Sequence, residues 1–190
     1  MRHLIKLLIV TLGTFSFFPG RAQNKDEMKA MMDYMTPGDI HKMMAKDSGT
    51  WSGAITIWEK PGAQPMTMNG EAKFEMILGG RYLQETSTAQ MMGMPFQGIG
   101  TFAYDNAKKI FLTSWIDNFG TGMMYLEGTW DQATRSVTFA GNEVDPVSGK
   151  DIKVREVMKF VDDNTQLMEM YSTSKGQEFK AMEIKFTRKM

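Results

Sequence analysis

Hydrophobic and polar residues alternate with a period of two along most of the chain after Gly49. Turn-forming residues such as Pro61-Gly62, Gly79-Gly80 and Lys175-Gly176 interrupt the alternation at short intervals. The links are too short for crossover helices, so an antiparallel up-and-down sheet is expected, closed into a single barrel of about eight to ten strands. The predicted strands are Trp51–Glu59, Met66–Leu78, Arg81–Thr88, Gln97–Tyr104, Lys109–Asp117, Gly122–Trp130, Ser136–Ala140, Ile152–Val161, Gln166–Ser172 and Glu178–Arg188. The fold class is therefore all-β.

A different pattern precedes the strands. Met28, Met31, Met32 and Met35 follow the i, i+3, i+4, i+7 spacing of one helix face. Thr36-Pro37 then predicts an N-cap and a first helical position for a second short helix. We expect one or two short N-terminal helices ahead of the barrel.

The chain begins with the features of an export signal. A basic start is followed by an apolar stretch, Leu7 to Phe18, and Gly20-Arg21-Ala22 offers small residues for cleavage. Twelve residues cover only about 18 Å of a helix, too short to span a bilayer, and no later segment is long and apolar enough to do so. We expect a signal peptide at 1–22, a methionine-rich helical leader at 23–46 and the barrel at 47–190. The protein should be exported, to the periplasm or the extracellular space.

Composition narrows the function classes. The predicted signal holds three of the 22 basic residues and no acidic one, which leaves 19 basic against 22 acidic residues. This balance gives no reason to expect nucleic acid as a partner. The chain has no cysteine, which excludes disulfides and thiolate metal sites. The sequence does not settle the oligomeric state.

Methionine is unusually frequent, with 19 residues after the signal against five leucines. Most of these methionines suit a packing role in place of leucine. The alternative for the leader is capture of copper(I) or silver(I), because thioethers bind soft monovalent ions. A third hypothesis is that the leader helices dock another envelope protein. The candidate metal ligands are Met28, Met31, Met32, Met35, His41, Met43 and Met44.

The sequence contains no recognisable catalytic motif. His41 is the single histidine after the predicted signal, and there is no nucleophile elbow, metalloprotease helix or phosphate-binding glycine loop. Asp117, Glu156 and Glu169 are the carboxylates that acid–base chemistry could use. We expect a binding protein rather than an enzyme, with no catalytic residues and no cofactor.

Two sets of residues resemble known families. Gly49-Thr50-Trp51 opens the first strand like the Gly-x-Trp start of calycin barrels, in which a basic residue of the last strand packs across the tryptophan. Arg188 stands at the matching place and would close the barrel with Gly49 and Trp51. Nitrobindins, which share this opening, bind haem through a histidine near the C-terminus, and no histidine follows His41 here.

A second resemblance covers nearly the whole chain after the leader. Its motifs are Leu78-Gly79-Gly80-Arg81-Tyr82-Leu83, Gln97-Gly98-Ile99-Gly100, Trp115-Ile116-Asp117, Asp145-Pro146 and the ending Met182-Glu183-Ile184 through Arg188. These resemble the bacterial family called domain of unknown function 1579. The resemblance implies a calycin-like barrel and no particular reaction.

The interior of such a barrel is the natural binding site. Aromatic residues could floor a pocket for a small apolar or amphipathic molecule, and two arginines could anchor a carboxylate head group. The candidate ligand-binding residues are Trp58, Arg81, Trp115, Tyr125, Arg155 and Met168. We expect non-enzymatic binding of such a molecule inside the barrel.

Overall fold

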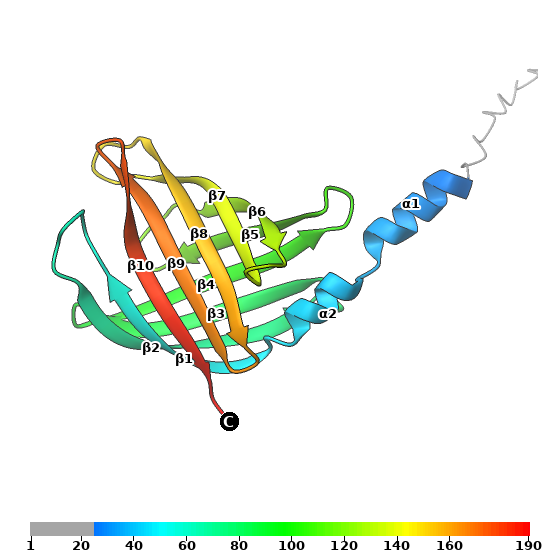
Figure 1. The fold of residues 1–190 in the computed structure, drawn as a ribbon, viewed down its shortest axis with the longest axis horizontal. Helices are drawn as coiled ribbons and strands as arrows, with labels where there is room; N and C mark the ends of the chain where they lie inside the picture. The colour runs from blue at the N-terminus through cyan, green and yellow to red at the C-terminus, as the bar shows by residue number, and fades with distance from the viewer. Residues whose placement is uncertain (1–24) are drawn as a thin grey trace, which may run out of the picture.

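The computed structural model describes residues 25–190, so the predicted signal peptide lies outside the described part. Ten antiparallel strands form a closed barrel in which each strand pairs with its neighbours in sequence and β1 pairs with β10 (Figure 1). The predicted all-β, up-and-down barrel is confirmed. The strands are β1 Gly49–Ile57, β2 Met66–Ile77, β3 Tyr82–Met91, β4 Met94–Asp105, β5 Ile110–Asp117, β6 Met124–Asp131, β7 Ser136–Val144, β8 Asp151–Asp162, β9 Thr165–Ser174 and β10 Gln177–Arg188.

The up-and-down order places successive hairpin turns at alternate ends of the barrel. Turns 78–81, 106–109, 132–135 and 163–164 share one end with the start of β1, which we call the closed end. Turns 58–65, 92–93, 118–123, 145–150 and 175–176 form the other, the open end.

Two helices precede the barrel, α1 (Lys25–Met35) and α2 (Asp39–Ala45). No residue of α1 is buried, and Figure 1 shows this helix projecting away from the barrel. The Thr36 hydroxyl donates to the Met32 carbonyl and thus belongs to the end of α1, while Gly38 is the N-cap of α2. The predicted cap at Thr36 was two residues too early. Among residues 25–190, neither helix has the length and apolar character needed to cross a membrane.

Helix α2 covers the closed end. His41 and Met44 are buried there, and the Gly38 N–H donates to His41 Nδ1 at 3.1 Å. The His41 ring also meets the Tyr104 ring edge-on, with centroids 6.1 Å apart. Burial, followed by the charge of Arg81, lowers the pKa of His41. The side chain is therefore a neutral packing group between the helix and the barrel wall.

The first and last strands join at the closed end through Trp51 and Arg188, which are register partners. The guanidinium lies 4.2 Å from the centroid of the Trp51 ring, and Trp51 is fully buried. Arg188 also donates to the backbone carbonyls of Lys46, Ser48 and Asp163. Gly49 adopts φ +135°, and a Cβ there would stand 3.0 Å from Arg188 Nη1, so glycine is needed beside the guanidinium.

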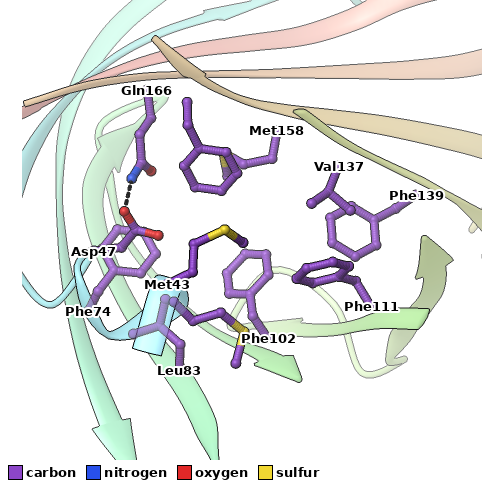
Figure 2. Close-up of a pocket in the computed structure, with 12 residues that line it drawn as sticks. Met43, Asp47, Phe74, Leu83, Phe102, Phe111, Val137, Phe139, Met158 and Gln166 are labelled. Atoms are coloured by element: carbon purple, nitrogen blue, oxygen red, sulfur yellow. Dashed lines mark hydrogen bonds between the residues drawn. The ribbon is translucent and has the colours of Figure 1, made fainter. Parts of the chain in front are cut away.

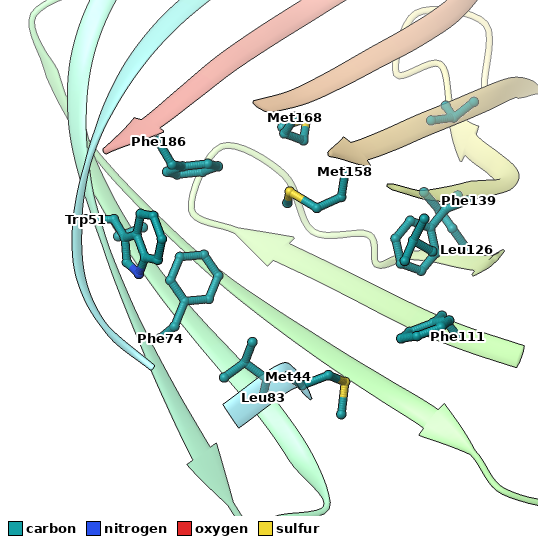
Figure 3. Close-up of a cluster of buried hydrophobic side chains, with 13 residues drawn as sticks. Met44, Trp51, Phe74, Leu83, Phe111, Leu126, Phe139, Met158, Met168 and Phe186 are labelled. Atoms are coloured by element: carbon teal, nitrogen blue, oxygen red, sulfur yellow. The ribbon is translucent and has the colours of Figure 1, made fainter. Parts of the chain in front are cut away.

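The hydrophobic core fills the closed half of the barrel (Figure 3). Phe74 meets both Trp51 and Phe186 edge-on, with centroids 6.3 and 5.9 Å apart. Phe139 and Leu126 extend the cluster on the other wall, where Gly128 leaves room for the Phe139 ring. This packing seals the end opposite the open turns.

The β3–β4 hairpin is longer than the sequence predicted. The alternation indicated an end at Thr88 and a new start at Gln97, whereas the ladder continues to a two-residue turn, Met92-Gly93. Both turn residues have positive φ, +52° and +77°, as a type I′ turn requires. Methionine is an unusual residue for that conformation, so the sequence carried no clear turn signal there.

Candidate functional site

A cavity of about 680 Å³ occupies the open half of the barrel. Its floor is made by core side chains such as Met158 and Phe186, and its rim includes Val144 and the 118–123 loop. One wall is rich in sulfur, because Met168, Met170 and Met182 all line it. The barrel is thus filled at one end and hollow at the other.

An aromatic group forms the opposite wall. Trp115 stacks on Phe96 with centroids 6.4 Å apart, and Phe96 meets Phe119 edge-on at 5.5 Å. Trp115 Nε1 donates to Asp117 Oδ2 at 2.9 Å, which fixes the ring orientation. All four residues line the cavity.

Glycines in β4 allow the Trp115 ring to lie flat on the strand. A Cβ built at Gly98 would stand 2.2 Å from Trp115 Cζ2, and one at Gly100 would stand 3.2 Å from Cε3. No side chain could occupy Gly98 without displacing the indole. The Gly98-Ile99-Gly100 pattern is therefore a seat for a cavity-lining tryptophan.

Carboxylates are the charged groups of this cavity. The side chains of Glu85, Glu143, Glu156 and Asp117 line it, whereas Glu71 borders it on an outward position of β2. Among residues 25–190, no lysine, arginine or histidine lines it. Glu85 and Glu156 are only 6% and 7% exposed. Ser87 Oγ donates to Glu85 Oε1 at 2.5 Å, and Ser172 Oγ donates to Glu143 Oε1 at 3.3 Å.

Burial changes the titration of these acids. Desolvation raises the pKa of Glu85 to about 7, against the opposing hydrogen bond from Ser87. It raises the pKa of Glu156 to about 7 as well, with a further contribution from the charge of Glu85. Burial also raises the pKa of Glu143. The protonation of the cavity therefore changes near neutral pH.

A second, much smaller cavity of about 40 Å³ lies under α2 (Figure 2). Gln166 Nε2 donates to Asp47 Oδ1 at 2.6 Å on one side of it. Burial raises the pKa of Asp47 to about 7, although the charge of Arg188 and the Gln166 hydrogen bond act in the other direction. Phe102 and Met158 line both cavities and so separate them.

The structure brings together two of the six ligand-binding candidates, Trp115 and Met168, which both line the large cavity. The other four do not line it. Trp58 lies just beyond β1, and its backbone N–H donates to the Ala181 carbonyl. Tyr125 is 49% exposed and donates to Glu127.

Both arginine candidates have their guanidinium groups engaged elsewhere. Arg81 donates to the carbonyls of Leu78 and Met35 at the closed end. Arg155 lies over the Tyr171 ring and pairs with Glu178 at 2.7 Å. Neither arginine lines the cavity, and ligand contact stays a prediction for all six candidates.

The proposed soft-metal ligands are divided between two environments. Met28, Met31, Met32 and Met35 on α1 are about half exposed, at 45–54%. His41 and Met44 are buried residues of α2, and Met43 of the same helix lines the small cavity. The seven side chains therefore do not converge on one point. Metal binding by the leader stays a prediction.

The three carboxylates singled out for acid–base chemistry differ in surroundings. Asp117 accepts hydrogen bonds from Trp115 and from the backbone N–H groups of Phe119 and Gly120, so it orders the rim loop. Glu169 pairs with Lys180. Only Glu156 is both buried and directed at the cavity. The second buried acid of the cavity, Glu85 on the opposite wall, was not identified from the sequence.

Comparisons with known proteins support the fold. The crystal structure of Rv2717c from M. tuberculosis matches with a TM-score of 0.61 at 13% identity, covering 82% of this chain and 100% of that chain. No curated protein matches the chain. The family model described as "Protein of unknown function (DUF1579)" matches residues 36–188, which includes α2 and the whole barrel and leaves α1 outside. The chain therefore belongs to the DUF1579 family, as its motifs predicted.

Proposed function

We propose that the protein binds a small hydrophobic or amphipathic molecule inside the barrel. The observation that carries this proposal is the cavity of about 680 Å³ in the open half. Ligand sites in proteins usually measure roughly 300–1,000 Å³ and are mostly apolar with a few polar groups. The aromatic wall, the methionine wall and the buried carboxylates fit that description.

The methionine wall supports binding of an apolar group. Thioether side chains have several rotatable bonds and adapt to irregular shapes, and they interact well with other apolar groups. Met168, Met170 and Met182 come from β9 and β10 and face the aromatic wall of β4 and β5. An apolar ligand between these walls would be enclosed on both sides.

The test is native mass spectrometry of gently purified protein, followed by organic extraction and by titration with the neutral fluorophore N-phenylnaphthylamine. We expect a bound molecule or saturable probe binding. Ala89 lines the cavity, so Ala89→Trp should fill part of it and abolish binding. Gln90→Trp, at the next and exposed position of β3, should not. Absence of both co-purified molecule and probe binding would exclude the proposal.

A second proposal concerns α1, where four half-exposed methionines lie on one helix face. Exposed thioethers at this spacing can bind copper(I). Titration with copper(I) against a competing chelator, on the wild type and on a variant with these four residues changed to leucine, tests it. Unchanged affinity in the variant would exclude the metal proposal and favour the alternative, contact with another protein.

A further inference from the structure

The sign of charge inside the cavity restricts the ligand. Among residues 25–190, four acidic side chains and no basic one line it, and the two arginines predicted as ligand anchors have their guanidinium groups engaged elsewhere. On β8, strand alternation explains why an acid and not a base lines the cavity, since Glu156 points inward and its neighbour Arg155 points outward. A ligand carboxylate would meet only like charge in this cavity, whereas a cation would meet opposite charge.

Glu85 and Glu156 stand on opposite sides of the lumen. In the closed ring of ten strands, β3 and β8 are separated by five positions in either direction. Both side chains line the same cavity, and the negative charge of Glu85 contributes to the raised pKa of Glu156. A ligand head group between them can therefore be contacted from two sides.

Glu156 has no partner in the described part of the chain. Within residues 25–190 no group donates a hydrogen bond to its carboxyl and no cation pairs with it, although the residue is 93% buried. Buried carboxylates in folded proteins are normally paired or hydrogen-bonded. Among residues 25–190 no fully enclosed side-chain oxygen or nitrogen lacks a hydrogen-bond partner, so the unbonded Glu156 oxygens are open to the cavity. Glu85 has one donor, the Ser87 hydroxyl. The two acids together therefore have at least three carboxyl oxygens without a hydrogen-bond donor, and these lie beside a space that a ligand could fill.

Trp115 adds a second feature suited to a cation. Glu85 Oε2 and Trp115 Cε3 lie 3.3 and 3.2 Å from the same point above Gly100, so the carboxyl and the indole are side by side. Indole faces attract ammonium groups. An ammonium head near Glu85 would therefore have a carboxylate and an aromatic ring within reach.

We propose that the cavity selects an amphipathic molecule with a protonated amine as its head group, which lies between Glu85 and Glu156 while the apolar part lies along Met168, Met170 and Met182. This inference rests on the proposed function, since it names the ligand class for the same cavity. The ammonium group donates up to three hydrogen bonds, which matches acceptors on two walls.

The proposal implies that binding strengthens as pH rises through neutrality. The amine stays protonated over this range, whereas Glu85 and Glu156 lose protons near pH 7. The other acidic side chains on the cavity wall are Glu143 and Asp117, and Glu71 lies nearby on the outer face of β2. Glu143 is held by Ser172, Glu71 pairs with Lys189, and Asp117 is held by Trp115.

The experiment compares decylamine, decanol and decanoate by isothermal titration calorimetry with the full chain, below the micelle concentration of each. Decylamine should bind tightest, by about tenfold or more over decanol, because an ionic hydrogen bond contributes more than a neutral one. Decanoate should bind weakest. Raising the pH from about 5.5 to about 8.5 should tighten decylamine binding alone.

Glu156→Gln and Glu85→Gln should each weaken decylamine binding by about tenfold and leave decanol binding unchanged. Glu178→Gln, on the outer surface, is the matched control and should change neither. Equal binding of all three probes, or decylamine binding that survives both cavity substitutions, would overturn this inference and leave the binding function intact. Absence of binding by all three probes would exclude both.

Discussion

The unpartnered carboxyl of Glu156 gives the sharpest stability prediction. Glu156→Gln keeps the shape of the side chain and removes its charge. Most substitutions of buried residues destabilise a protein, but here the ionised side chain is buried without a cation or a hydrogen-bond donor among residues 25–190. We expect the variant to be more stable than the wild type at alkaline pH.

The magnitude follows from proton linkage. Burial, with the charge of Glu85, raises the pKa of Glu156 from its ordinary value of 4.5 to about 7. The folded state therefore retains a proton that the unfolded chain releases, and wild-type stability falls as pH rises through this interval. Each pKa unit corresponds to about 1.4 kcal/mol, so the ionised Glu156 costs the fold about 3 kcal/mol above neutrality. Below pH 4.5 both forms are neutral, and this difference disappears.

Thermal unfolding followed by circular dichroism at about pH 4 and about pH 8.5 measures this effect. The Tm of Glu156→Gln should exceed that of the wild type by roughly 5–10 °C at the higher pH and by little at the lower. Glu75→Gln is the control, since Glu75 is on an outward position of β2 with a 63% exposed side chain. A variant less stable than the wild type at pH 8.5 would refute the reasoning, because it would mean that the carboxylate has a stabilising partner.

Three further outcomes are expected. Gly98→Ala should displace the Trp115 ring, because Trp115 Cζ2 would stand 2.2 Å from the new Cβ. We expect the free energy of unfolding to fall by about 1–3 kcal/mol and the tryptophan emission to shift. Gly122→Ala, whose Cβ would meet nothing within 4 Å, should change neither. Arg188→Lys should lower the free energy of unfolding in denaturant by about 2 kcal/mol, since it breaks hydrogen bonds to three backbone carbonyls. The control Arg155→Lys, on the outer surface, should lower it by less than about 1 kcal/mol. Equal losses would argue against Arg188 as the residue that closes the barrel. His41→Ala should lower the Tm, whereas Met31→Ala on α1 should not, because only the first side chain is buried.

The sequence predicted the strands well and their ends less well. Period-two alternation is a local property, so all ten strands were predictable from the pattern alone. The β3–β4 turn was missed because Met92 adopts positive φ without being glycine or asparagine. The cap at Gly38 was misplaced because glycine caps a helix without a side-chain signal, whereas Thr36 carries one.

The site shows a similar division. Glu156 follows the inward parity of Val154 and Met158, and Glu85 that of Leu83, so the alternation indicated two acids on apolar faces. Arg155, which was predicted as a ligand anchor, has the opposite parity to Glu156, and the same alternation indicated its outward position.

The sequence by itself determined the secondary structure, the antiparallel strand order and the family, since these depend on neighbours in the chain and on local motifs. It also predicted the pairing of Trp51 with Arg188, which stand at the two ends of the strand pattern. Only the tertiary structure decided that the barrel is filled at one end and hollow at the other, and that β3 and β8 bring Glu85 and Glu156 to opposite sides of the cavity. Alternation tells which way a side chain points, whereas the space between facing side chains depends on how strands distant in sequence curve around one another.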